Sequence, residues 1–103
     1  MQTPAAAPIF VVHSPTAFAV NGWLVDLILI QHWGQEQGGA KFHGIKTSLS
    51  ILKHFIEKLQ IASKQPPDEG QIKRTMTALR RLADYGYYIP PEVFHSASQK
   101  KDD

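Results

Sequence analysis

Two pairs of adjacent basic residues are the feature of this sequence best suited to binding chemistry. Lys73-Arg74 and Arg80-Arg81 are offset by seven residues. Seven residues make two turns of an α-helix, so both pairs project from similar angles and lie about 10 Å apart. Such an arrangement can contact neighbouring phosphates of a nucleic acid or two carboxylates of a partner helix. We therefore predict that this segment is exposed and contacts a partner.

Three tyrosines follow the basic pairs along the chain. Binding hot spots favour Tyr and Arg, so tyrosines beside exposed arginines are typical of a protein interface. Two other interpretations fit the same residues: the rings cap the open end of a helical bundle, or they stack on single-stranded bases. The predicted partner-binding site consists of Lys73, Arg74, Arg80, Arg81, Tyr85, Tyr87 and Tyr88.

The residue types that catalysis and metal binding require form no recognisable set. The chain has five histidines and no cysteine. His32, His43 and His54 recur every eleven residues, but glycines interrupt any helix through them, and no histidine pair has the i, i+4 spacing of a zinc site. No serine lies in a G-x-S-x-G motif and no glycine-rich phosphate loop occurs. We predict no catalytic residue, no metal site and no cofactor, and hence a protein that is not an enzyme.

Asp26 is the one acidic residue inside the apolar segment 17–30. A carboxylate there either faces solvent or is buried beside a partner such as Lys53, Arg74 or an indole N–H. A catalytic carboxylate normally works with a second acid, a base or a metal ion, and the nearest acid, Glu36, is ten residues away. We expect Asp26 to have a structural role.

Charge is distributed unevenly along the 103 residues, whose formal net charge is +2. Residues 41–81 contain nine basic and three acidic side chains, a net of +6, whereas residues 1–40 and 82–103 each have a net charge of −2. A basic segment of this kind suits an acidic protein, a nucleic acid or an anionic lipid surface, although lysines spread for solubility give the same count. The 43% apolar composition is that of a folded domain and not of a disordered chain.

The apolar segment predicts the first helix. Ser14-Pro15 resembles a helix start, with a capping hydroxyl and a proline at the first helical position. From residue 17 to residue 30 the only interruptions are Asn21, Gly22 and Asp26. The segment is too short to span a bilayer, and we expect a helix over residues 15–33 that lies at the centre of a bundle or packs against a second chain.

Two amphipathic helices are expected after a loop over residues 38–44. The second helix covers residues 45–63, where apolar residues alternate at spacings of four and three. Pro66-Pro67 ends it, Asp68 and Glu69 favour the start of a third helix, and Gly86 favours its end. Apolar residues form one face of this third helix, and the basic pairs lie on the other. The apolar positions of the second helix are Ile45, Leu49, Leu52, Ile56 and Leu59, and those of the third are Ile72, Met76, Leu79 and Ala83.

These elements predict an all-α fold, a small bundle of three main helices. An extended N-terminal arm with room for a short strand covers residues 1–14, a single helical domain covers residues 15–95 and includes an aromatic C-terminal segment, and a polar tail covers residues 96–103. No residue pattern is specific enough to indicate a family.

The predicted function is that of a small non-enzymatic interaction protein, an adaptor or regulator that binds another protein through the basic and aromatic site. The alternative is a nucleic-acid-binding regulator that places the basic segment 41–81 on phosphates. The helix over residues 15–33 is expected to form a homodimer or a hetero-complex. We expect no membrane attachment, and because small secreted domains usually contain cysteines, we expect a cytoplasmic protein.

Overall fold

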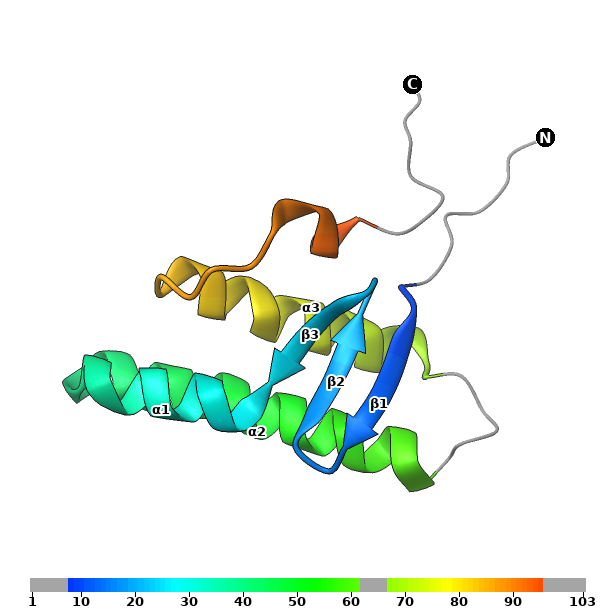
Figure 1. The fold of residues 1–103 in the computed structure, drawn as a ribbon, viewed down its shortest axis with the longest axis horizontal. Helices are drawn as coiled ribbons and strands as arrows, with labels where there is room; N and C mark the ends of the chain where they lie inside the picture. Colours follow the sequence, from blue (N-terminus) through cyan, green and yellow to red (C-terminus); the bar gives the residue numbers. More distant parts are fainter. Residues whose placement is uncertain (1–7, 62–66, 96–103) are drawn as a thin grey trace.

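The computed structural model describes residues 8–61 and 67–95 and has an α+β architecture, so the predicted all-α bundle is wrong. A three-stranded sheet comes first and three helices follow. The elements are Phe10–Ser14 (β1), Ala17–Val20 (β2), Trp23–Asp26 (β3), Leu27–Gln37 (α1), Gly39–Ile61 (α2), Glu69–Asp84 (α3) and the 3-10 helix Pro91–Phe94 (η1). In Figure 1 the strands lie in front of α2 and α3.

The expected helix over residues 15–33 is replaced by a hairpin because of the Asn21-Gly22 turn. These two residues join β2 to β3 and have φ values of 50° and 85°. A two-residue turn with positive φ at both positions matches the right-handed twist of paired strands, and Asn-Gly adopts it most readily. Residues 17–20 and 23–26 therefore pair as strands, and only the last four residues of the apolar segment, 27–30, are helical, as the start of α1.

Ser14 and Asp26 have different roles from those expected of a helix start. The Ser14 hydroxyl accepts a hydrogen bond from the Thr16 amide at 3.2 Å, within the turn that joins β1 to β2. Asp26 is the residue that caps α1, where its carboxylate accepts hydrogen bonds from the amides of Ile28 and Leu29 at 3.0 and 3.2 Å. A carboxylate satisfies these otherwise unpaired amides and interacts favourably with the helix dipole.

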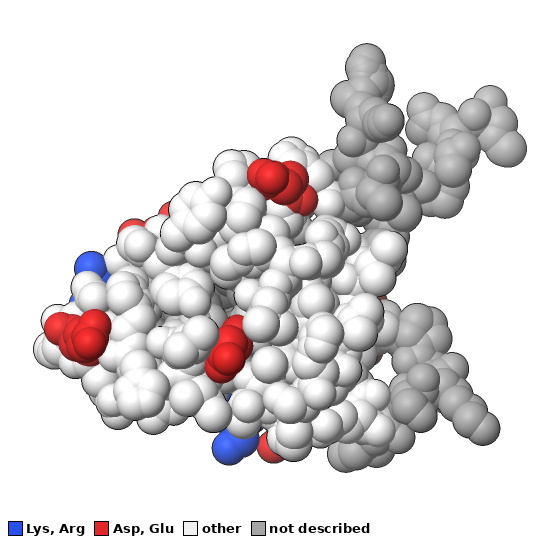
Figure 2. Space-filling model, in the orientation of Figure 1, with Lys and Arg blue, Asp and Glu red and all other residues white. Residues whose placement is uncertain are grey.

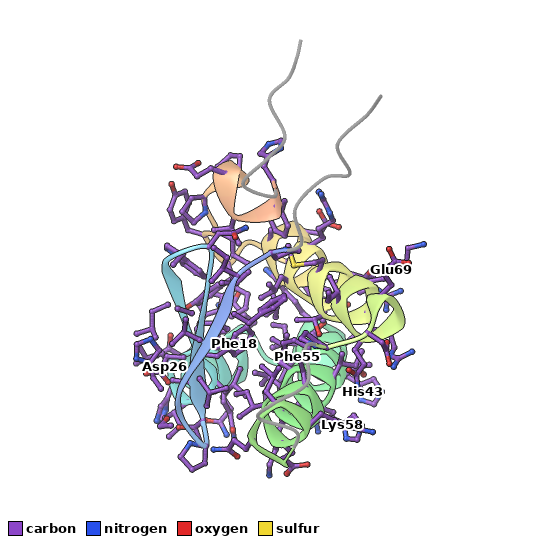
Figure 3. The ribbon with its side chains drawn as sticks, turned by 90° about the vertical axis from the view of Figure 1, so that its right-hand side faces the viewer. Phe18, Asp26, His43, Phe55, Lys58 and Glu69 are labelled. Atoms are coloured by element: carbon purple, nitrogen blue, oxygen red, sulfur yellow. The ribbon has the colours of Figure 1, made fainter. Side chains whose placement is uncertain are left out.

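The antiparallel sheet, with strand order β1-β2-β3, has one buried face and one open face. Val12, Phe18 and Val25 are paired across the strands and point inward. Phe18 and Phe10 meet Phe55 of α2, with ring centroids 5.9 and 4.8 Å from that of Phe55. Figure 3 shows Phe18 and Phe55 between the sheet and the helix. This aromatic contact fixes the sheet on α2 because offset and edge-on rings pack well and bury a large apolar area.

Glycines set the positions of the helices. Gly38, with a φ of 69°, ends α1, but the loop expected over residues 38–44 is wrong because α2 already begins at Gly39. Gly34 and Gly44 allow close packing: a Cβ on Gly34 would lie 2.8 Å from Ile45, and one on Gly44 would overlap the Tyr85 hydroxyl. Both helices therefore approach their neighbours more closely than any larger residue permits.

The third helix matches its prediction, and the chain after it returns to the sheet. Asp68 caps α3 together with Gln71 in a reciprocal capping box. After α3, the chain reaches η1, and Val93 of η1 and His95 just after it are tied to the Asn21 turn. The Asn21 side chain donates hydrogen bonds to the carbonyls of Val93 and His95 at 3.0 and 2.9 Å and accepts one from the Ile9 amide at 3.1 Å. The predicted polar tail over residues 96–103 and the first seven residues of the N-terminal arm lie outside the described residues.

Replacing Asn21 tests this connection. Asn21→Gly keeps a residue that tolerates positive φ but removes the three side-chain hydrogen bonds, so we expect the free energy of unfolding to fall by about 1–3 kcal/mol. Urea denaturation measures the loss. Gln37→Ala is a matched control because the Gln37 amide donates only to Trp33 of its own helix, and it should cost less than about 0.5 kcal/mol. Equal stability of Asn21→Gly and the unmodified protein would contradict the proposed tie.

Candidate partner-binding surface

The α3 basic surface, defined by Lys73, Arg74, Arg80 and Arg81, is exposed to solvent. Its exposure follows from the sequence of α3, whose opposite face buries Thr75, Ala78, Leu79 and Leu82 against the core. A helix with 3.6 residues per turn that buries these positions must direct the residues between them outward. The four cations therefore all lie on α3, and the packing of the buried face of α3 fixes the position of their backbone.

Arg74 and Arg81 line a groove between α2 and α3. The groove has a volume of about 390 Å³, and its floor includes Ile51 of α2 and Ala78 of α3. Lys73 also reaches this groove. Because Arg74 and Arg81 are two helical turns apart, their side chains flank the apolar floor at a separation of about 10 Å along the helix axis.

Lys73 and Arg80 line a second depression on the other side of α3. It has a volume of about 590 Å³ and is also lined by Ile72, Met76 and Glu69. The Arg80 guanidinium lies 4.4 Å from the centroid of the Phe94 ring, so a cation–π contact orients it. The helical angle thus regroups the two predicted basic pairs: Arg74 and Arg81 line the groove, Arg80 lines the depression, and Lys73 lines both. Sequence reasoning missed the apolar floors, although the apolar line of α3 at spacings of three and four signals them.

The basic side chains are segregated from the sheet. Every lysine and arginine within residues 8–61 and 67–95 lies on α2 or α3. Figure 2 shows the sheet side of the molecule, where blue surface appears only at the margins and the few charges elsewhere are acidic. Figure 3 shows Lys58 and Glu69 on the side away from the sheet. The protein therefore has one basic side and one side nearly free of cations.

The three predicted tyrosines do not form one surface with these cations. Tyr85 is half-buried, with its hydroxyl packed against Gly44 of α2. Tyr87 is also half-buried and lies edge-on to Trp33 and Trp23, at centroid distances of 5.1 and 6.5 Å. Tyr88 is 73% exposed. Two of the three rings therefore pack within the protein, leaving only Tyr88 largely free for contact.

Burial among these rings changes the acidity of Tyr87. Desolvation is the larger cause and the negative charge of Asp26 is the smaller one, and both raise the pKa of the Tyr87 hydroxyl above its ordinary value of 10.0. The folded protein thus holds this proton more tightly than the unfolded chain does. The contribution of the Tyr87 hydroxyl to the free energy of unfolding is therefore fully present below pH 10, and it is lost as the pH rises above that value.

Asp26→Asn tests the contribution of the carboxylate, because Asn also caps helices well while it lacks the charge. In a Tyr85→Phe/Tyr88→Phe background Tyr87 is the one tyrosine left to titrate, and tyrosinate absorbance reports its pKa. We expect Asp26→Asn to lower this pKa towards 10 but not to reach it, since burial is unchanged. Asp84→Asn is the matched charge control and should leave the titration where it was. A pKa that does not respond to Asp26→Asn would contradict the electrostatic cause.

Two further properties of the described part of the chain bear on its function. Its His, Asp and Glu residues do not gather in any group of three or more that can hold a metal ion. None of its helices combines the length and the hydropathy needed to cross a bilayer.

This chain was compared with protein-family models, with curated proteins and with solved structures, and it matches none of them.

Proposed function

We propose that this chain is a non-enzymatic adaptor or regulator that binds an acidic amphipathic segment of another protein through the α3 basic surface. The contact sites are the groove between α2 and α3 and the adjoining depression on α3. We assign this role to the cytoplasm, because a chain without cysteine lacks the disulfides common in small secreted domains.

The observation that supports this proposal is the combination of cations with an apolar floor. Ile51 and Ala78 lie at the bottom of the groove, and Arg74 and Arg81 are at its side. A helix docked in a groove is held by apolar residues at i, i+3, i+4 and i+7. Carboxylates seven residues apart on such a helix match the spacing of the two arginines, and arginine binds carboxylates in a bidentate manner.

A phosphate backbone uses the same cations differently. Phosphate contacts need exposed positive charge but gain little from an apolar floor, and their affinity falls steeply with salt concentration. An acidic amphipathic helix retains the apolar part of its binding free energy when salt screens the charges. The salt dependence and the role of the apolar positions therefore separate the two kinds of partner.

The experiment measures fluorescence anisotropy of labelled probes with the full chain at low and near-physiological salt. The probes are a helical peptide with Glu at i and i+7 and Leu at i+3 and i+4, a scrambled peptide of the same composition, and duplex and single-stranded oligonucleotides. We expect the patterned peptide to bind at both salt concentrations and about tenfold more tightly than the scrambled one, a difference of about 1.4 kcal/mol.

Charge reversal tests which cations bind. Arg74→Glu/Arg81→Glu should weaken binding of the patterned peptide at least tenfold. Lys46→Glu/Lys53→Glu is the matched control: it makes the same charge change at the same seven-residue spacing, but these lysines lie on α2 beside a different depression, next to α1. Circular dichroism verifies that both variants are folded. Equal binding of the two peptides, equal losses in both variants, or a preference for oligonucleotides with steep salt dependence would overturn the proposal.

A further inference from the structure

The outer face of the sheet, defined by Ile9, Val11, Ala17, Ala19 and Leu24, is apolar and open to solvent. Val11, Ala19 and Leu24 are paired across the three strands and therefore point to the same side. Val11 and Leu24 are each 49% exposed, and Ile9, just before β1, is 60% exposed. Contiguous apolar patches on a protein surface are often contact sites for a partner.

This face has the shape of a trough between two ridges. The middle strand contributes only the methyl groups of Ala17 and Ala19, whereas the larger side chains of Val11 and Leu24 stand on the strands to either side. The two ridges are about 10 Å apart, twice the spacing of neighbouring strands. Ala19 is only 8% exposed because the ridges shield it. A row of side chains from another molecule, each as wide as Val11 or Leu24, fits into the trough between the two ridges.

A ridge and a matching trough on one face meet the condition for a two-fold symmetric contact, in which the same patch of each copy must complement itself. Two such sheets pack face to face about 10 Å apart, with their strands rotated by about 30°. We propose that the outer face of the sheet is a self-association surface, on which a second copy of this chain packs its own sheet face.

The distribution of charge favours a second copy over an acidic partner. Lysines and arginines of the described residues are confined to α2 and α3, and the sheet side has cations only at its margins (Figure 2). Face-to-face packing thus keeps the basic sides of the two copies on opposite outer surfaces, where they repel each other least. Asp26 is the charged residue of the face, and it lies at the end of β3, with its carboxylate already bonded to two amides.

The size of the face sets the strength of the contact. Three strands of up to five residues present about 250 Å² in projection. The first helix, α1, extends this surface directly from β3, and its Leu29 is 59% exposed. With α1 adding about 160 Å², the projected area of the contact is about 410 Å² per copy, which is small beside the roughly 600–1,000 Å² of accessible surface that each partner buries in a specific interface. We therefore expect a dimer in concentration-dependent exchange with monomer.

Sedimentation equilibrium of the full chain over a wide concentration range tests the proposal. The unmodified protein should fit a monomer–dimer equilibrium. Leu24→Lys should weaken association at least tenfold, because each copy would then bury an unpaired ammonium group. Ile28→Lys is the matched control, since Ile28 is also about half exposed but lies beside Lys46 and Lys53, about 100° around α1 from Leu29 and away from the side of α1 that extends the sheet face. It should leave association unchanged.

Ala19→Leu distinguishes a fitted contact from a merely adhesive patch. The substitution adds apolar area but fills the trough, so a fitted contact should weaken, whereas non-specific association should strengthen. Ala19→Val provides a smaller filling that suits a strand, and circular dichroism verifies the fold of each variant. A protein that stays monomeric at all concentrations, a dimer that persists in Leu24→Lys through pairing of β1 edges, or stronger association of Ala19→Leu would overturn the proposal.

Discussion

The left-handed turn at Asn21-Gly22 is the constraint on which the rest of the fold depends. It reverses a long apolar segment so that β2 and β3 pair, and the chain then enters α1 at the Asp26 cap. The same Asn21 side chain bonds to Ile9 before β1, to Val93 of η1 and to His95 just after η1, the last two being 72 and 74 positions away in sequence. One side chain thus joins the turn between β2 and β3 to both ends of the described chain, because an amide has both a donor and an acceptor group to offer.

The hairpin also separates apolar from basic surface. With the sheet on one side of α2, the lysines and arginines of the described residues lie on α2 and α3 and leave the outer face of the sheet free of cations except at its margins. Helix amphipathicity alone would not produce this result. A bundle of three helices exposes polar faces all round, whereas a sheet packed on a helix leaves an outer face whose polarity is independent of the helices.

The helices were predictable where one side of the pattern is polar, and the short strand expected within residues 1–14 is present as β1, but β2 and β3 were not predicted. α3 alternates buried and charged positions at helical spacing, so both its boundaries and the exposure of Lys73, Arg74, Arg80 and Arg81 follow from the sequence. The four residues of β2 are all buried, because its outer methyl groups are shielded by neighbouring strands, and the alternation typical of a strand is therefore absent. Asn-Gly was the available signal for a hairpin. The packing of Tyr85 and Tyr87 depends on Gly44, Trp23 and Trp33, which are distant in sequence, and no local pattern indicates it.

The proposed surfaces are compatible because they lie on different sides of the molecule. A partner helix in the groove between α2 and α3 contacts none of the residues that form the outer face of the sheet. A dimer formed through the sheets would present two α3 basic surfaces that point away from each other. Each would then bind its own acidic segment, and a partner with two such segments would gain affinity only if its linker spanned both subunits. The separation of the two surfaces therefore favours bridging of two partner molecules over tight capture of one.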